Sequence, residues 1–156
     1  KIIELIHSNI NFQKRSETWI KLLFIASQDN DINKAQIIYR KNNLYNVEIL
    51  NAPCKIDSIK LLDKYLNIYH NSLEYCLPLP PESSYKYIFS LIKNKNYNKA
   101  FIDEWIGSKN FNLGERNKPE MQLCYGHEKD PNFFLNNEKF QELSLTLFEP
   151  LLASIL

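Results

Sequence analysis

One segment of the chain carries apolar side chains on almost every side of a helix, and it constrains the fold more than any other feature. Ser16 precedes Glu17 and has the hydroxyl of an N-cap, so we expect a helix that begins there and ends near Ser27. Its apolar residues are Trp19, Ile20, Leu22, Leu23, Phe24, Ile25 and Ala26. Because a helix that is apolar all round is a buried one, the rest of the chain must cover it.

Two further regions predict strands. Residues 1–12 contain four isoleucines, and we interpret them as a strand or, as an alternative, a short helix. Residues 36–40 and 44–50 predict a β-hairpin, because Lys41-Asn42-Asn43 between them supplies asparagines that tolerate a positive φ.

The remainder of the chain predicts helices. Leu77-Pro78-Leu79-Pro80-Pro81 must be extended, because each proline disfavours the helical conformation of the residue before it. Helical spacing of apolar residues predicts a long amphipathic helix through Ile56, Ile59, Leu62, Leu66, Tyr69 and Leu73. Further helices are expected over residues 82–93, over 97–106 with Gly107 as its stop, and over 136–149 with Pro150 as its stop. Residues 108–119 predict a polar loop, and residues 120–125 fit either a strand or a helix. The expected fold class is α+β, dominated by helices.

Composition limits the class of protein. The chain has 156 residues, with 19 Lys and Arg against 18 Asp and Glu, which suits a single domain and excludes a strongly basic nucleic-acid coat. It has no run of about 18 apolar residues, so no membrane span is expected. Because it starts at Lys1 without a signal peptide, we interpret residues 1–156 as a fragment of a larger subunit. Three widely spaced cysteines, Cys54, Cys76 and Cys124, argue against a disulfide framework and for a reducing compartment.

Few residues suit metal binding or catalysis. Glycine occurs only at positions 107, 114 and 126, so neither a phosphate-binding loop nor a nucleophile elbow can be built. Cys124 and His127 supply two ligands where a zinc site needs four, and we expect no metal site. Trp19 and Trp105 are interpreted as core anchors rather than as platforms for stacked bases.

The absence of one nuclease pattern is more informative. Many metal-dependent nucleases place an acidic residue and a lysine two positions apart on one strand, so that both side chains point to the same face. No lysine in this sequence has Asp or Glu two positions before it.

Several motifs, taken in their order, resemble one family. The Trp19 helix and the hairpin are followed by Pro78-Leu-Pro-Pro-Glu-Ser83, Glu104-Trp-Ile-Gly107, Gly114-Glu-Arg116 and a closing Pro150-Leu-Leu152. This order resembles the C-terminal part of the gamma subunit of exodeoxyribonuclease V, the RecC component of the bacterial RecBCD helicase–nuclease. The resemblance spans most of the chain from about residue 16 onward.

The resemblance implies part of a restriction-endonuclease-like domain, of the PD-(D/E)xK type, with a β-hairpin and a degenerate active site. It implies no catalytic residue and no cofactor in this fragment, since Mg²⁺ and ATP are used by the partner subunits. The implied partners are the RecB-like and RecD-like subunits, double-stranded DNA ends and the unwound strands. The implied setting is double-strand break repair and recombination in the bacterial cytoplasm.

Within such a complex the domain would be a scaffold that guides DNA strands. The candidate residues for contact with DNA or a partner are Lys14, Arg15, Arg40, Lys41 and Arg116. Residues 93–99 interleave lysines with Tyr97, but an ordinary solvated surface is the favoured interpretation there. Two alternatives stay open: an active Mg²⁺-dependent nuclease of the same fold, and a helical adaptor that binds only protein.

Overall fold

The computed structural model describes residues 2–29, 31–107 and 113–155, and the chain divides into two compact units. Unit 1 consists of the residues up to Asn67 together with those from Pro150 onward. Unit 2 consists of Ile68–Glu149. The single domain expected over residues 1–156 stays a prediction. The fold class is α+β and rich in helices, with one small sheet, as predicted.

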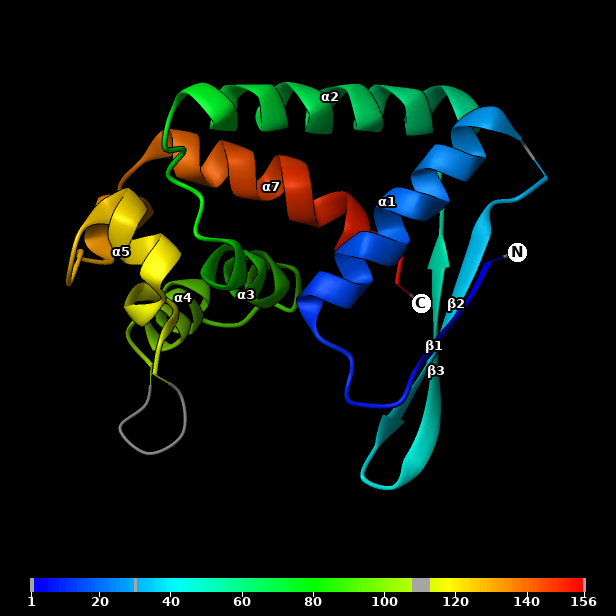
Figure 1. Cartoon of the computed structure of the whole chain (residues 1–156), viewed down its shortest axis with the longest axis horizontal. Coiled ribbons are helices and arrows are strands. Elements are labelled where there is room, and N and C mark those ends of the chain that lie inside the picture. The colour runs from blue at the N-terminus through cyan, green and yellow to red at the C-terminus, as the bar shows by residue number, and fades with distance from the viewer. Residues whose placement is uncertain (1, 30, 108–112, 156) are drawn as a thin grey trace. The chain divides into compact units, whose positions relative to one another are not determined.

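Unit 1 is built on a three-stranded sheet with the strand order β1-β2-β3 (Figure 1). β1 (Ile2–Ile6) is parallel to β2 (Lys34–Lys41), which is antiparallel to β3 (Leu44–Asn51). The predicted hairpin is confirmed, and Asn42 and Asn43 form its turn with φ values of 51° and 63°. Two consecutive positive φ values are typical of the type I′ turn that joins twisted antiparallel strands.

Helix α1 (Phe12–Gln28) supplies much of the unit 1 core. Its side chains Trp19, Leu22, Leu23 and Ala26 are buried, as are Ala35, Ile37 and Leu50 of the sheet. The indole N–H of Trp19 donates to the Tyr65 hydroxyl of α2 (Lys55–Glu74) at 3.2 Å. Trp19 is therefore a core anchor, as predicted.

Two expectations for α1 are wrong. The helix begins one turn earlier than Ser16, because the Asn11 side chain accepts the Lys14 backbone N–H at 2.9 Å and caps it. The helix is also not buried all round, since Ile20 and Phe24 are 48% and 61% exposed. These two residues are one turn apart and lie on the same side of the helix.

Helix α2 has the predicted extent, but its predicted apolar stripe is mostly exposed to solvent. Ser58 is fully buried and Tyr65 points toward Trp19, so the helix packs through these positions instead. The exposed apolar residues of α2 are Ile56, Ile59, Leu66, Tyr69 and Leu73.

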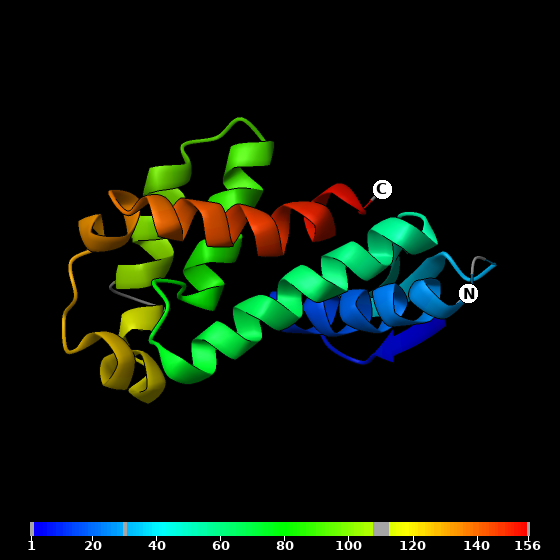
Figure 2. The ribbon, with the colours of Figure 1, turned by 90° about the horizontal axis from the view of Figure 1, so that it is seen from above.

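Unit 2 is helical and has an aromatic core. Helices α3 (Pro81–Ile92) and α4 (Tyr97–Ile106) pack against each other (Figure 2). They are followed by the 3-10 turn η1 (Glu115–Asn117), α5 (Pro119–Tyr125), α6 (Asn132–Leu135) and α7 (Glu138–Ala153). The core contains Phe101, Trp105, Phe134 and Phe140, all fully buried. Trp105 donates its indole N–H to the Lys129 carbonyl at 2.8 Å, so this tryptophan is also a core anchor.

The end of the chain corrects a second group of predictions. Pro150 does not end the last helix but lies inside α7, where its carbonyl still accepts the Ser154 N–H at 3.1 Å. Of the two alternatives for residues 120–125, the helix is confirmed, whereas α6 is a short helix that no pattern predicted. Of the predicted loop, residues 108–112 lie outside the described part of the chain. No helix in that described part combines the length and hydropathy needed to cross a bilayer.

Candidate functional site

Two glutamates of the unit 1 sheet occupy one cross-strand row. Glu4 of β1 is opposite Ile37 of β2, and Ile37 is opposite Glu48 of β3. Directly opposed residues point to the same face of a sheet, so all three side chains share a face. Strands lie about 4.8 Å apart, which puts the two glutamate backbones about 10 Å apart with the buried Ile37 between them.

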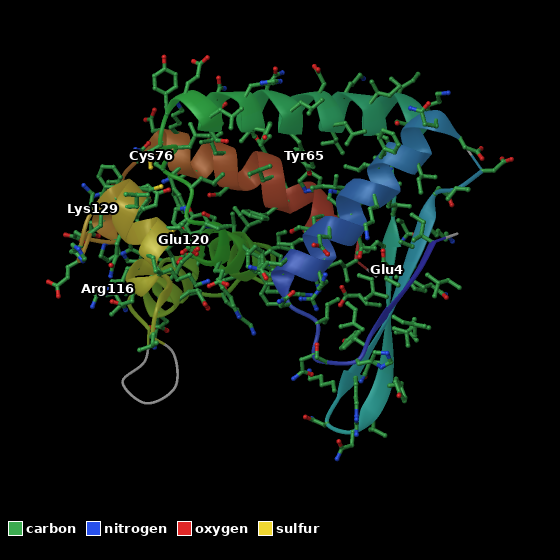
Figure 3. All side chains as sticks on the ribbon, in the orientation of Figure 1. Glu4, Tyr65, Cys76, Arg116, Glu120 and Lys129 are labelled. Carbon is green, nitrogen blue, oxygen red and sulfur yellow. The ribbon has the colours of Figure 1, made fainter. Side chains whose placement is uncertain are left out.

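Each of these glutamates is paired with a cation of α1. Arg15 binds Glu48 in a fork, with its Nε 2.7 Å from Oε1 and a terminal nitrogen 2.9 Å from Oε2. The Glu48 side chain is only 10% exposed, so this pair is largely removed from water. Lys21 binds Glu4 at 2.8 Å, and this hydrogen bond raises the pKa of the Lys21 ammonium group. Figure 3 labels Glu4 on its strand.

This arrangement does not suit a divalent ion. An ion such as Mg²⁺ needs oxygen ligands that converge to about 2.1 Å from it. Here a buried isoleucine separates the two carboxylates, and each is already bound to a different cation. Where a nuclease would add a lysine two positions on, Glu48 is followed by the buried Leu50. Over residues 2–29, 31–107 and 113–155, no three His, Cys, Asp or Glu side chains are placed to hold a metal.

The opposite face of the sheet is largely apolar, although it contains Gln36 and, opposite Tyr45, Arg40, and its edges are exposed. Two cross-strand rows form it, Ile3-Gln36-Ile49 and Leu5-Ile38-Val47. Ile3, Leu5 and Val47 are 57%, 66% and 58% exposed, and Tyr45 next to Val47 on this face is 69% exposed. We call these residues the outer sheet face. A contiguous exposed apolar patch of this kind is typical of a surface that binds another protein.

The five predicted contact residues have different environments. Lys14 is exposed and 2.7 Å from Glu17, whereas Arg15 is occupied by Glu48. Arg40 and Lys41 lie at the exposed hairpin tip, where Arg40 donates to the Asn43 side chain at 3.0 Å.

The fifth residue, Arg116, lies in η1 of unit 2 (labelled in Figure 3). Its Nε is buried and has no hydrogen-bond partner among the described residues. Lys14 and Arg15, like Arg40 and Lys41, are neighbours only because they are consecutive in the sequence. Whether any of the five contacts DNA or a partner stays a prediction.

Two of the sequence motifs join in unit 2. The carboxylate of Glu115, from the Gly-Glu-Arg motif, accepts the backbone N–H groups of Glu82 and Ser83 at 2.9 and 2.7 Å. These two residues belong to the Pro-Pro-Glu-Ser motif and form the first turn of α3. Glu115 therefore caps α3, a helix without a side-chain cap of its own. Glu115 is 1% exposed, and this burial raises the pKa of its carboxyl group.

The cap requires a glycine at position 114, because the backbone there lies too close to Ile106 for any side chain. Its φ is +73°, and an added Cβ would lie 2.3 Å from the carbonyl carbon and oxygen of Ile106. The Gly-Glu-Arg motif therefore has a structural role that the sequence pattern did not indicate.

The geometry of unit 1 defines an α+β domain whose sheet carboxylates are neutralised by its own helix. Residues 1–91 match the family described as the RecC C-terminal domain. This match covers more than half of the chain, and the chain belongs to that family. The matched region includes the sheet, α1, α2 and most of α3, whereas the Gly-Glu-Arg motif and α7 lie beyond it. A comparison with curated proteins gives no match.

The sequence alone did not reveal the row of Glu4 and Glu48. One signal was available, because Glu48 interrupts the apolar run from Val47 to Leu50. A charged residue at an inward position of a strand requires a partner, but the sequence does not identify Arg15 as that partner.

Proposed function

We propose that this chain is the non-catalytic, nuclease-like C-terminal domain of the gamma subunit of exodeoxyribonuclease V. In this role it is a scaffold and a guide for DNA strands in double-strand break repair and recombination in the bacterial cytoplasm. Membership of the RecC C-terminal domain family supports the assignment to this subunit. The partners would be the RecB-like and RecD-like subunits, which use the Mg²⁺ and ATP.

The observation that carries the proposal is the contrast between the two faces of the sheet. On the inner face, Arg15 and Lys21 neutralise the two carboxylates that a metal-dependent nuclease would need free. On the outer sheet face, Ile3, Leu5 and Val47 leave apolar surface exposed to solvent. A domain of this kind favours binding to partners over cleavage.

The proposal for DNA guidance centres on the hairpin tip. Arg40 and Lys41 are exposed there, and the type I′ turn holds them at the end of two paired strands. Cations at a rigid, exposed tip suit contact with a phosphate backbone, which requires charge but no base-specific geometry.

A cleavage assay separates this proposal from an active nuclease. The chain is incubated with linear and forked DNA in Mg²⁺, and we expect no cleavage. Glu48→Gln is the matched variant, because it removes a carboxylate charge from the inner face. Mg²⁺-dependent cleavage that is lost in E48Q would contradict the proposal and support the enzyme.

An assembly assay tests the scaffold role. Leu5→Lys with Val47→Lys places two charges on the outer sheet face, and Leu123→Lys is the control because Leu123 is 89% exposed in unit 2. Each variant is introduced into the full subunit and co-purified with its partner subunits. We expect L5K/V47K to reduce recovery of the complex while L123K does not. Equal recovery, with circular dichroism unchanged, would count against the outer sheet face as the partner surface.

A gel shift distinguishes strand guidance from a protein-only adaptor. The full subunit is titrated with forked DNA at several salt concentrations. Salt-dependent binding supports strand guidance, because release of counterions drives contacts to phosphate. The absence of any shift at low salt supports the adaptor.

A further inference from the structure

Unit 2 brings together two cysteines that are 48 positions apart in the sequence. Cys76 lies in the segment between α2 and α3, and Cys124 lies in the last turn of α5. The Cys76 thiol donates a hydrogen bond to the Cys124 carbonyl over 3.4 Å. Both cysteines are exposed, and Figure 3 labels Cys76.

The residue after Cys124 fixes the two backbone segments beside each other. The Tyr125 hydroxyl donates to the Leu77 carbonyl at 2.6 Å and accepts the Leu79 N–H at 3.1 Å. The Tyr125 side chain therefore holds the segment that follows Cys76 beside the end of α5.

The two thiols also interact electrostatically. Partial burial of the thiol raises the pKa of Cys76 to about 11, and its interactions with Cys124 add to the increase. Cys76 therefore stays protonated at neutral pH, which makes it a poor first nucleophile.

Both cysteines line a cavity of about 340 Å³ whose wall includes two cations, Lys129 and Lys139. The Lys129 ammonium group is held 3.9 Å above the centre of the Phe133 ring. A small molecule that reaches the thiols through this cavity passes these charges, so anionic molecules are favoured.

We propose that Cys76 and Cys124 form a reversible intramolecular disulfide when the chain meets an anionic, low-molecular-weight disulfide. The Cys124 thiolate attacks one sulfur of that molecule, whose S–S bond breaks and releases a first thiolate that takes up a proton. Cys76 then loses its proton to water and attacks the Cys124 sulfur, which releases a second small thiol. The two cysteines lose two electrons, and one small disulfide is reduced to two thiols.

The new bond would connect the segment that leads into α3 to the end of α5. The chain between them contains α3, α4 and the Glu115 cap, so oxidation closes a long loop around the unit 2 core. Closing a long loop stabilises mainly by restricting the unfolded chain. Oxidation should therefore raise the unfolding temperature of the chain.

The test uses the full chain treated with glutathione disulfide. We expect the thiols of Cys76 and Cys124 to be lost together, with a mass decrease of about 2 Da for the peptides that contain them and a Cys76–Cys124 cross-link in peptide maps. Cys54→Ser is the matched control and should behave like the unchanged chain. Cys76→Ser and Cys124→Ser should lack this cross-link, and C76S should stop at the mixed disulfide. A persistent mixed disulfide at Cys76 or Cys124 of the unchanged chain, or cross-links through Cys54, would overturn the proposal.

A second measurement tests the cavity. Lys129→Gln with Lys139→Gln should slow oxidation by glutathione disulfide several-fold but leave oxidation by neutral hydroxyethyl disulfide unchanged. Equal slowing with both reagents would show that the cations do not select the oxidant and would overturn that part of the proposal.

The disulfide should also be reversible, so dithiothreitol should restore all three thiols.

Discussion

Gly114 and Gly126 have similar backbone conformations but different surroundings. Their φ values are +73° and +82°, a region that residues with a side chain rarely occupy. Of the two, Gly114 is enclosed, since an added Cβ would overlap the backbone of Ile106, whereas a Cβ at Gly126 would meet no described atom within 4 Å apart from its neighbours along the chain. The two glycines thus separate the effect of backbone conformation from the effect of close packing.

We predict that Gly114→Ala destabilises the chain much more than Gly126→Ala. Gly126→Ala should lower the free energy of unfolding by about 1 kcal/mol, which is the cost of the left-handed conformation for a residue with a Cβ. Gly114→Ala adds a clash with backbone atoms that cannot move aside, so its cost should exceed about 2 kcal/mol. Urea unfolding of both variants measures the difference, and equal costs would contradict the close approach to Ile106.

Glu115 gives a prediction about pH. Burial raises its folded-state pKa above the value of 4.5 for an exposed glutamate, so the folded chain binds this proton more tightly than the unfolded chain. The contribution of Glu115 to the free energy of unfolding should therefore fall as the pH rises from about 4.5 through the folded-state pKa, and then level off.

Glu115→Gln isolates this contribution, because the amide does not titrate. The free energy of unfolding of the unchanged chain minus that of E115Q should decrease with pH across this window. Urea unfolding at a series of pH values measures this difference. An increase with pH would show that the backbone N–H groups of Glu82 and Ser83 outweigh burial.

At the scale of elements, α1 and β3 are joined by a partly buried ion pair. Removing Arg15 leaves the Glu48 carboxylate without its fork of two hydrogen bonds, in a position that is 10% exposed. A buried charge without its partner costs more free energy than the ion pair contributes. A variant that lacks Arg15 alone should therefore be less stable than a variant that lacks both Arg15 and Glu48.

We predict that Arg15→Met lowers the free energy of unfolding by about 3 kcal/mol and that adding Glu48→Leu recovers most of the loss. Lys14→Ala is the matched control, because the neighbouring pair with Glu17 is exposed and should contribute little. Chemical denaturation measures the free energy of unfolding of the unchanged chain, R15M, the double variant R15M/E48L and K14A. A double variant as unstable as R15M would indicate that Arg15 acts through its own packing.

Local patterns in the sequence predicted most elements but not how they pair. The two asparagines predicted the hairpin turn because a positive φ is a property of single residues. Once Asn42 and Asn43 form the turn, the pairing of Ile37 with Glu48 follows from the count along both strands. The pairing of β1 with β2 could not be predicted, since it joins distant segments and fixes Glu4 in the same row.

Three features of the helices depart from what the local patterns predict. Asn11 and Ser16 are both N-cap residues, and only the extended backbone at Asn11 decides between them. Pro150 predicts a stop, but a proline removes one donor and the helix continues for another turn. On α2, the periodicity located an apolar stripe correctly but could not indicate that the stripe faces solvent.

At the scale of the whole molecule, strand guidance by the hairpin tip has a thermodynamic signature. If Arg40 and Lys41 each contact a phosphate, Arg40→Gln with Lys41→Gln should reduce the slope of log K against log salt by about 2 for forked DNA. Lys60→Gln is the control, because Lys60 is exposed on α2 and pairs with Asp57. Fluorescence anisotropy with the full subunit measures the slopes, and an unchanged slope would remove the hairpin tip from the DNA path.

The cap on α3 also affects where this protein can be truncated. Similarity to the family ends at residue 91, but the first turn of α3 is completed by Glu115, 32 to 33 positions further along the chain. A fragment that stops where the similarity stops would contain a helix without its Glu115 cap and with an exposed apolar side. Such a fragment should express poorly and aggregate, so the boundary defined by homology is a poor guide to where this protein can be truncated.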